Sequence, residues 1–492
     1  MKVTVPRVPA STLAGLFVVV AGGLALRLWV LGASQGAVSA DEAYTGLQAF
    51  RILDGDLPLV IEGQAYTAVF DSYLLAPILG VVGASVWALK ALPILWWTLA
   101  SILIFRVASR VCDRPTAVVV GSLFWLAPGA LMILSTRSYE GYGAGLVFVL
   151  VSVLAAQTLL ATKSPEVRTS LVLGAASGLA FYAHPMYLAV IAPILVMSSI
   201  VHRRCVRRFW LPLIASVMMA NAPLIVWNIR NDWSTFDQPS TAPSSYFGRL
   251  GSLLTQVVPR VFGLRDFDGG WTLGRPLAVL ILVVVTTLAA VGVVVVARTN
   301  PAGQVIALVV VTCLPVLAIF RNTSFVDDAR YGIVFFPFLV LVVTAGASSL
   351  LIDFAKTFVV GVVLVGWCGS LVVPWLLDNQ GPRRGDPNTD ARAIVEVLQS
   401  RGFDSVAGSF WWVLPIEYLS DRDIRGAVVG EPFTVRVIDS QRRVEAEPGT
   451  EVPYVFAAED EQIGVLPLPG DAYERQKIGD AVVYLPLAAL SE

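Results

Sequence analysis

The chain has 492 residues, of which 56% are hydrophobic and only 14% are charged, and its mean hydropathy is +0.72. Soluble domains carry roughly 25% charged residues, so this composition excludes an ordinary soluble protein and favours a polytopic membrane protein. The net charge of −1 hides an asymmetry. Residues 378–492 carry 20 acidic and 11 basic residues, whereas the residues before them carry 16 acidic and 24 basic ones. We therefore expect the two parts to face different surroundings.

Eleven apolar segments are candidates for helices that cross a bilayer, which needs about 20 residues. They cover residues 10–32, 86–107, 116–134, 143–162, 170–184, 186–201, 209–227, 273–297, 303–320, 331–352 and 357–376. The predicted fold class is therefore an α-helical polytopic membrane protein with about 11 spans.

Basic residues recur in alternate loops between these segments, which is the pattern of cytoplasmic loops. They are Lys2, Arg7, Arg106, Arg110, Arg114, Lys163, Arg168, Arg203, Arg204, Arg207, Arg208, Arg298 and Lys356. This pattern predicts a cytoplasmic N-terminus. With an odd number of spans, the C-terminal part and the intervening loops 33–85, 135–142, 228–272 and 321–330 are then extracytoplasmic.

The segment from Thr67 to Val82 is apolar but short, and Asp71 and Pro77 interrupt it. We expect it to form an in-plane or re-entrant helix within the first extracytoplasmic loop, residues 33–85. The alternative is an ordinary span, and a hairpin with the next segment would then raise the count to twelve or thirteen.

The composition changes again near Asp378, where Pro, Gly, Asn and charged residues predict a linker over residues 378–388 that follows a transmembrane domain, residues 1–377. Residues 389–492 are expected to form a small extracytoplasmic α/β domain, which is long enough to bury a core of its own. Its predicted elements are a helix from Thr389 to about Arg401, a strand over Ser405–Ser409, a helix over Trp412–Leu419, and strands over Val452–Ala457 and Ala481–Pro486.

An adjacent acid pair, Asp41-Glu42, lies where the chain leaves the first predicted span. A carboxylate in a partly desolvated pocket is a better base than one in bulk water, so the pair suits general-base catalysis or metal binding. The structural alternative is that the pair only caps a helix that begins near Ala43, because Asp is a favourable N-cap residue.

Several motifs occur in a fixed order along the chain. After the acid pair come Gly55-Asp56-Leu57-Pro58, Gly63-Gln64-Ala65-Tyr66, Val86-Trp87-Ala88-Leu89-Lys90-Ala91-Leu92-Pro93, Phe181-Tyr182-Ala183-His184-Pro185, Asn221-Ala222-Pro223 and Arg330-Tyr331. Taken together, the region 1–376 resembles the GT-C glycosyltransferases, and the nearest branch is that of the protein O-mannosyltransferases and the lipid A aminoarabinose transferases.

The resemblance implies an inverting glycosyltransferase of a bacterial plasma membrane. Its donor is a polyprenyl-phosphate sugar, and its acceptor is an extracytoplasmic hydroxyl of an envelope glycan, lipid or protein. Asp41, with Glu42 beside it, becomes the expected general base. The implied chemistry needs no nucleotide and no nucleic-acid partner, and it requires no certain cofactor, although a divalent metal stays an option.

The donor's phosphate is the leaving group, so the site needs cations or donors near it. We assign this role to Arg330, Lys90, Tyr331 and His184. Each has a structural alternative: a salt bridge of Arg330 with Asp327 or Asp328, snorkelling of Lys90 to the interface, and packing of His184 at a helix end.

Further candidates for the substrate pocket are Tyr66, Asp71, Arg137, Tyr139, Glu140 and Asp328. Glu140 stands where relatives usually place an Asp, which leaves a metal-binding role open. Two other classes of function remain as alternatives. A transporter or polyprenyl-phosphate flippase should carry charges at mid-membrane and related halves, and a non-catalytic scaffold should lack sugar transfer altogether.

Overall fold

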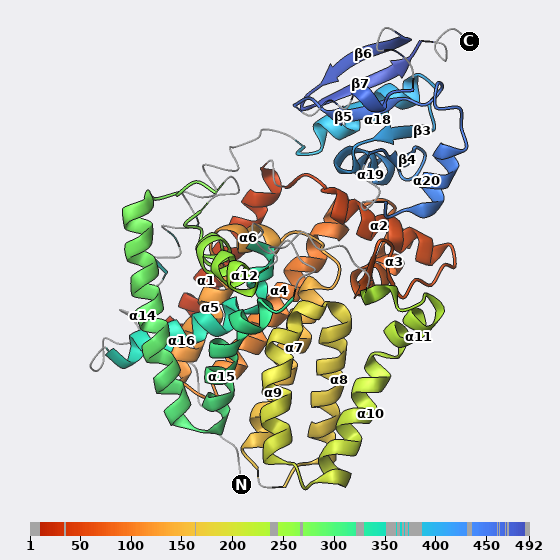
Figure 1. Ribbon diagram of the computed structural model, residues 1–492. Coiled ribbons are helices and arrows are strands. Elements are labelled where there is room, and N and C mark those ends of the chain that lie inside the picture. The colour runs from red at the N-terminus through yellow and green to blue at the C-terminus, as the bar shows by residue number, and fades with distance from the viewer. Residues whose placement is uncertain are drawn as a thin grey trace.

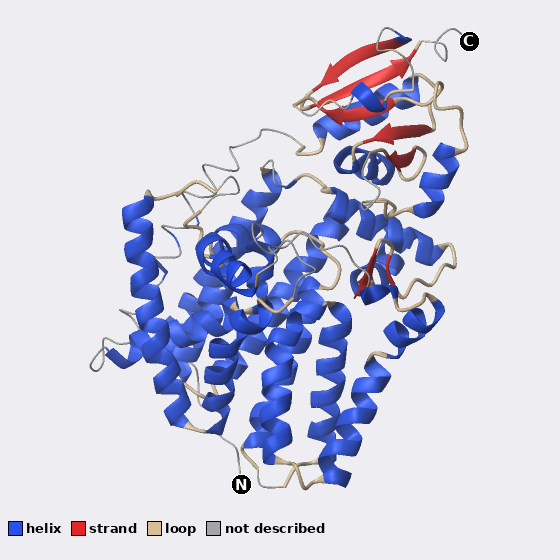
Figure 2. Ribbon diagram, viewed as in Figure 1, coloured by secondary structure: helices blue, strands red, loops and turns tan. Residues whose placement is uncertain are grey.

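A computed structural model describes residues 10–33, 36–162, 164–236, 245–265, 269–320, 329–350, 361, 365–366, 369, 372, 386–430, 435–459, 461, 463–467, 469 and 472–487. Figure 1 shows a bundle of helices with a small domain at one end, and Figure 2 shows that nearly all of the strands lie in that domain. We call the end of the bundle that contacts this domain the domain-side end.

The bundle is built from helices whose positions follow the apolar segments of the sequence. They are α1 (Ala10–Gly32), α4 (Val86–Ala108), α5 (Arg114–Leu126), α6 (Gly129–Leu134), α7 (Tyr142–Leu160), α8 (Val167–Ala183), η2 (Pro185–Tyr187), α9 (Leu188–Val201), η3 (Val206–Trp210), α10 (Leu211–Ala220), α11 (Ala222–Arg230), α14 (Arg275–Thr299), α15 (Pro301–Leu317), η6 (Ala329–Val334) and α16 (Phe336–Leu350). Each of the first ten predicted segments overlaps one of these helices. Most of the eleventh, residues 357–376, lies outside the described residues.

Fewer helices than expected are long enough to cross a bilayer by themselves. Among the described residues, α1, α4, α7 and α14 meet this criterion, and α10 and α11 form a fifth candidate if this pair, bent by 54°, is one span. The predicted segment 116–134 is broken as well, because Ala127 takes a φ of 34° before Pro128 and separates α5 from α6. The number of spans therefore stays a prediction.

The first loop of the bundle carries helix α2 (Ala40–Leu53), a hairpin of β1 (Val60–Ile61) and β2 (Gln64–Ala68), and helix α3 (Phe70–Val82). Helix α2 begins earlier than expected. Its N-cap is Ser39, whose side chain accepts a hydrogen bond from the Glu42 backbone N–H while the Glu42 side chain returns to Ser39. The N-cap is therefore Ser39, and the alternative that the acid pair caps the helix holds only for Glu42, as a member of this capping box.

Helix α3 starts three residues later than the predicted in-plane segment, because Thr67 and Ala68 pair within the hairpin. Its 13 residues rise only about 20 Å, less than the ~30 Å of a hydrocarbon core. The length is therefore compatible with a helix that does not cross, and its in-plane orientation stays a prediction.

The C-terminal domain is a five-stranded mixed sheet flanked by helices. Its elements are α18 (Thr389–Ser400), β3 (Ser405–Gly408), α19 (Phe410–Leu419), β4 (Arg425–Val428), α20 (Ile438–Glu445), β5 (Tyr454–Ala457), η8 (Ile463–Val465), β6 (Tyr473–Ile478) and β7 (Ala481–Pro486). The strand order is β4-β3-β5-β7-β6, in which β3 is parallel to β4 and β5, and β7 is antiparallel to β5 and β6. Sequence patterns predicted five of these nine elements and missed β4, α20, η8 and β6.

The domain packs directly on the first loop, as Figure 1 shows for α19 above α2 and α3. One apolar core contains residues of both parts, including Phe50 and Leu79 of the loop and Phe410 and Tyr418 of the domain. The Tyr418 hydroxyl donates to the Ser85 carbonyl oxygen at 3.1 Å. Because this core is shared, the position of α2 depends on the C-terminal domain.

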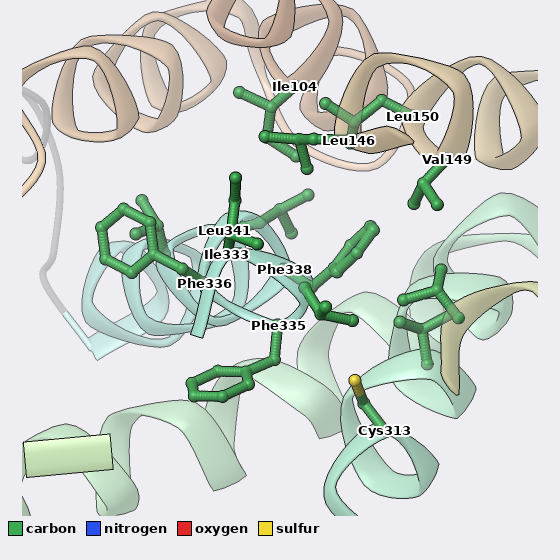
Figure 3. Packing of buried hydrophobic residues seen from close by; sticks show 14 of the residues in the cluster. Ile104, Leu146, Val149, Leu150, Cys313, Ile333, Phe335, Phe336, Phe338 and Leu341 are labelled. Atoms are coloured by element: carbon green, nitrogen blue, oxygen red, sulfur yellow. The ribbon is translucent and has the colours of Figure 1, made fainter. Parts of the chain in front are cut away.

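The bundle has a second apolar core, which contains Phe336, Phe338 and Leu341 of α16. Figure 3 shows Leu341 pointing toward Ile104 of α4 and Leu146 of α7. A cavity of about 180 Å³ lies between α14, α15, α16 and the short helix η5 (Leu253–Val257), and its lining is almost entirely apolar. The remaining short helices η4 (Ser234–Phe236), α12 (Tyr246–Ser252) and α13 (Val258–Val261) lie in the connection between α11 and α14.

Candidate functional site

Asp41 and Arg330, which are far apart in the sequence, meet at the domain-side end. Asp41 lies in the first turn of α2 and Arg330 in η6, and an Arg330 Nη1 to Asp41 Oδ2 distance of 3.7 Å makes them an ion pair. The two side chains are 28% and 31% exposed. A carboxylate and a guanidinium therefore lie together where a substrate can reach both.

Aromatic side chains surround this pair. The Arg330 guanidinium lies 5.3 Å from the centre of the Tyr139 ring. His184 contacts Tyr66, Tyr142 and Tyr331, with ring centroids 5.5, 5.3 and 6.4 Å apart. The hydrophobic faces and polar edges of such rings suit a bound sugar.

His184 is a neutral hydrogen-bonding group in this site. Burial, followed by the positive charge of Arg330, lowers the pKa of His184 to about 3. Its Nδ1 accepts a hydrogen bond from the Met186 backbone N–H at 3.1 Å, so the ring's single proton is on Nε2. His184 can therefore donate one hydrogen bond to a phosphate or sugar oxygen, but it does not add a positive charge. Burial also raises the pKa of Tyr66, which keeps its hydroxyl protonated.

Glu42 and Lys90 form a buried ion pair next to Asp41. Lys90 Nζ lies 2.8 Å from both carboxylate oxygens of Glu42 and 3.1 Å from the Ala37 carbonyl oxygen, and the two side chains are 0% and 2% exposed. Neither the expected phosphate contact of Lys90 nor snorkelling fits this position. Lys90 instead compensates the charge of Glu42 and fixes its position. Glu42 in turn stabilises the N-terminus of α2 through the capping box with Ser39.

The short loop between α6 and α7 is fixed by bonds to the first loop. The Ser138 N–H donates to Glu42 Oε1 at 3.2 Å, and the Ser138 carbonyl oxygen accepts from the Thr45 hydroxyl at 3.2 Å. Arg137 Nη1 donates to the Tyr139 hydroxyl at 3.1 Å. These bonds place the Tyr139 ring against Arg330 and explain why this loop belongs to the site.

Asp71 and Glu140 lie together in the interior, where their hydrogen bonds are to α3 and α4. Glu140 accepts hydrogen bonds from the backbone N–H groups of Asp71 and Ser72, at 3.0 and 2.8 Å, and from the Ser72 hydroxyl. It thereby caps the N-terminus of α3 from another loop. Asp71 accepts from Trp96 Nε1 at 2.8 Å. Both acids are buried, so they build the scaffold of the site rather than its substrate-facing wall.

The two buried acids are not both fully ionised at neutral pH. Burial raises the pKa of Asp71 to about 7, against the opposing hydrogen bond from Trp96. Burial and the charge of Asp71 also raise the pKa of Glu140. An acid whose folded-state pKa exceeds its unfolded value of 3.8 lowers stability as the pH rises toward that folded pKa.

We therefore expect the unfolding temperature of the wild type to fall relative to that of Asp71→Asn as the pH rises from about 4 to about 7. The Asn side chain still accepts from Trp96 but has no charge to bury. Thermal unfolding in detergent at pH 5 and pH 8 measures the effect. The same pH dependence in the variant as in the wild type would contradict a raised pKa at Asp71.

The structure thus divides the candidates predicted from sequence into two groups. Asp41, Arg330, Tyr331, Tyr66, Arg137, Tyr139 and His184 gather around one point, whereas Glu42, Lys90, Asp71 and Glu140 support it. Asp328 lies outside the described residues.

In the described part of the chain, no group of three or more His, Cys, Asp or Glu side chains is arranged to hold a metal ion. The binding of a divalent metal, which the sequence left as an option, stays a prediction.

One residue of the site had no signal in the sequence. Arg436, which precedes α20 in the C-terminal domain, is only 9% exposed and reaches the hairpin turn of the first loop. Nothing in the sequence around it marks a motif. Only the docking of the domain on the loop, which no local pattern reveals, brings it close.

Neither a family model nor a curated protein matches the sequence. Solved structures do match. ArnT from Cupriavidus metallidurans aligns in its apo state with a TM-score of 0.66 and 14% sequence identity, over 98% of this chain and 99% of that chain. The same protein bound to undecaprenyl phosphate gives a TM-score of 0.63 at 14% identity over the same shares. The apo oligosaccharyltransferase of Archaeoglobus fulgidus gives 0.50 at 13% identity, over 93% of this chain and 72% of that chain.

The chain therefore shares the fold of these solved structures. The predicted architecture, a mainly helical bundle with a small sheet-containing domain, is confirmed. Identity of 13–14% shows the fold alone, so the glycosyltransferase branch expected from the sequence motifs stays a prediction.

Proposed function

We propose that the protein is an inverting glycosyltransferase that moves a sugar from a polyprenyl-phosphate donor to a hydroxyl group of an envelope glycan, lipid or protein. The observation that carries the proposal is the ion pair of Asp41 and Arg330 at the domain-side end, 3.7 Å long and partly exposed. It combines a general base for the acceptor with a cation for the phosphate. The GT-C fold supports this assignment.

In the proposed reaction, Asp41 takes the proton of the acceptor hydroxyl as its oxygen attacks the anomeric carbon. The bond between this carbon and the phosphate oxygen breaks on the opposite face, and its electron pair stays on the phosphate. The diester's single negative charge becomes the two charges of a phosphate monoester. A guanidinium fork beside the leaving oxygen stabilises this change, and Arg330 is placed to supply it.

The ion pair also suggests how the base becomes available. A distance of 3.7 Å is longer than a direct charge-assisted hydrogen bond of about 2.8 Å, so the pair is loose. A donor phosphate competes with Asp41 for Arg330. Once Arg330 turns to the phosphate, the carboxylate is free to accept the acceptor's proton. Donor binding would thus activate the base.

The apolar cavity between α14, α15 and α16 is the proposed place for the prenyl tail. Phe335 and Phe338 line it, together with Leu254, which is 50% exposed at its edge. Phe335 lies five residues after Arg330, directly past the end of the 3-10 helix η6 at Val334, which corresponds to about 10 Å. A lipid whose phosphate is at Arg330 can therefore place its first isoprene units in this cavity.

A transporter or flippase is the competing proposal. The charged residues described above gather at the domain-side end around α2 and η6, rather than half-way along the helices. An aromatic-lined acid and arginine at one end of the bundle favour chemistry at that end. This distribution supports the transferase over the transporter.

The proposal is tested by incubating the purified full-length protein with a panel of radiolabelled polyprenyl-phosphate sugars and envelope extract. We expect label from one donor class to appear in the extract. The panel also identifies the sugar, and fractionation of the extract identifies the acceptor. Failure of every donor to label any fraction would count against the transferase assignment.

Arg330→Gln is expected to raise the KM for the donor and to lower kcat/KM by about 10²–10³-fold, because the neutral amide cannot compensate the leaving phosphate. Arg330→Lys should retain part of the activity, since it keeps the charge but loses the fork. Steady-state transfer rates at varied donor concentration measure both effects. Arg401→Gln, at a position of the C-terminal domain whose side chain is 40% exposed, is the control. Unchanged donor kinetics in Arg330→Gln would remove Arg330 from the phosphate site.

A further inference from the structure

The C-terminal domain brings a second arginine, Arg436, to the hairpin of the first loop, which bonds to the helix that carries Asp41. Arg436 Nη1 donates to the Glu62 carbonyl oxygen at 3.2 Å, in the turn of the β1–β2 hairpin. Tyr66 follows this turn on β2 and contacts His184. The Arg436 side chain is 9% exposed, so it is enclosed between the domain and the loop rather than extended into solvent.

Glu62 and Gly63 hold the Arg436 segment on the hairpin. The Ile438 N–H donates to Glu62 Oε2 at 3.3 Å, while Glu62 Oε1 pairs with Arg51 at 2.8 Å. Gly63 takes a φ of +72°, and a Cβ at this position would lie 2.8 Å from Arg436 Nη1 and 3.0 Å from the Val435 carbonyl oxygen. The turn therefore requires glycine both for its backbone conformation and for the close approach of the arginine.

The position of the hairpin turn brings Arg436 to the substrate-facing side of α2. The Tyr44 hydroxyl accepts a hydrogen bond from the Glu62 N–H at 3.3 Å. Asp41 and Tyr44 are three residues apart in a helix and share one face. In agreement with this placement, Asp41, Tyr44 and Tyr66 act electrostatically on Arg436 and raise its pKa, although burial, the larger effect, lowers it.

The charges around the site leave room for an anionic ligand. Glu42 is compensated by Lys90 and Glu62 by Arg51. Arg436 differs from both, because among the described residues no carboxylate lies within ion-pair distance of its guanidinium, which instead bonds a backbone carbonyl oxygen. A guanidinium stays protonated at physiological pH, so this buried charge can be compensated by an anionic ligand. A phosphodiester brings one negative charge, and its departure as a monoester brings a second.

We propose that Arg436 of the C-terminal domain is a donor-binding residue, which contacts the phosphate of the polyprenyl-phosphate sugar together with Arg330. The inference rests on the proposed function. The hydrogen bond to Glu62 uses one of the five N–H donors of the guanidinium, so the others can serve a phosphate. The domain then completes the donor site, and its docking on the first loop has a catalytic purpose.

The test compares binding of polyprenyl phosphate with binding of the corresponding polyprenol, which has the same tail and no phosphate. Full-length wild type, Arg436→Gln, Arg436→Lys and Arg442→Gln are assayed in nanodiscs by the ligand-dependent rise in unfolding temperature. Arg442 is an exposed arginine six residues farther along, on α20, and serves as the matched control. Loss of a charge-assisted bond predicts roughly 10–100-fold weaker binding of polyprenyl phosphate by Arg436→Gln.

We expect polyprenol binding to be the same in all four proteins, Arg436→Lys to retain part of the preference for phosphate, and Arg442→Gln to retain all of it. An undiminished preference in Arg436→Gln overturns the inference. Equal weakening of both ligands with a lower unfolding temperature overturns it as well, because Arg436 would then only hold the domain in place. If the wild type itself shows no preference for the phosphate, the proposed donor is wrong and the inference falls with it.

Discussion

Replacing Asp41 with Asn is expected to lower kcat for sugar transfer by at least ~10²-fold, because an amide cannot take the proton of the acceptor hydroxyl. Binding of the donor should not weaken. Asp41 competes with the donor phosphate for Arg330 in our mechanism, so removal of its charge leaves the donor's KM unchanged or lowers it. The expected signature is therefore a loss in kcat alone, which separates Asp41→Asn from the KM effect of Arg330→Gln.

The control for this variant is Asp54→Asn. Asp54 ends α2, and its side chain is 60% exposed and paired with Arg422 at 2.5 Å. Its replacement should leave transfer unchanged, because surface ion pairs contribute little to stability. Unfolding temperatures in detergent verify that both variants are folded. Full activity of Asp41→Asn would remove Asp41 from the role of base.

The largest expected effect on stability comes from Lys90→Met, which leaves Glu42 buried without its cation. Breaking a buried ion pair costs about 3–5 kcal/mol, because the remaining charge is uncompensated. Glu42 also receives hydrogen bonds from Ser39 and Ser138, at 3.1 and 3.2 Å, so its displacement should loosen both the start of α2 and the loop that carries Tyr139. We expect a clearly lower unfolding temperature in detergent and loss of transfer.

Two further variants separate this effect from a general sensitivity to charge removal. The double variant Glu42→Gln/Lys90→Met should recover most of the stability, since no buried charge remains. Arg401→Met breaks the exposed pair with Glu474, whose side chains are 40% and 41% exposed, and should change stability by no more than about 1 kcal/mol. A Lys90→Met protein as stable as Arg401→Met would contradict the buried pair.

The positions of the helices in the bundle could be predicted from the sequence, because a helix that crosses a bilayer needs a long apolar segment. The positions at which these helices break could not be predicted. Ala127 and Asn221 interrupt two apolar segments that look continuous, because hydropathy does not register a change in backbone direction. Strand β6 was missed as well, since its alternating exposed residues, from Tyr473 to Ile478, are mostly polar and carry little apolar signal.

Residues of the candidate site could be predicted where they belong to a recognisable sequence motif. They could not be predicted where their role depends on a partner that is distant in the sequence. Asp41 and Arg330 were identified from motifs. Lys90 was expected to face a phosphate, because nothing local shows that Glu42 lies 2.8 Å away. Glu140 looked like a pocket acid, yet it caps α3 through the N–H groups of Asp71 and Ser72. Pairing between distant segments, rather than residue type, determined these roles.

The central claim is that the protein transfers the sugar and releases the lipid phosphate at one site. The most direct measurement uses a donor labelled with one isotope in the sugar and another in the phosphate. We predict that sugar label enters the acceptor in the same molar amount as labelled polyprenyl phosphate is released, and that Asp41→Asn abolishes both. Movement of intact donor across a vesicle membrane without release of polyprenyl phosphate would contradict the account and favour a flippase.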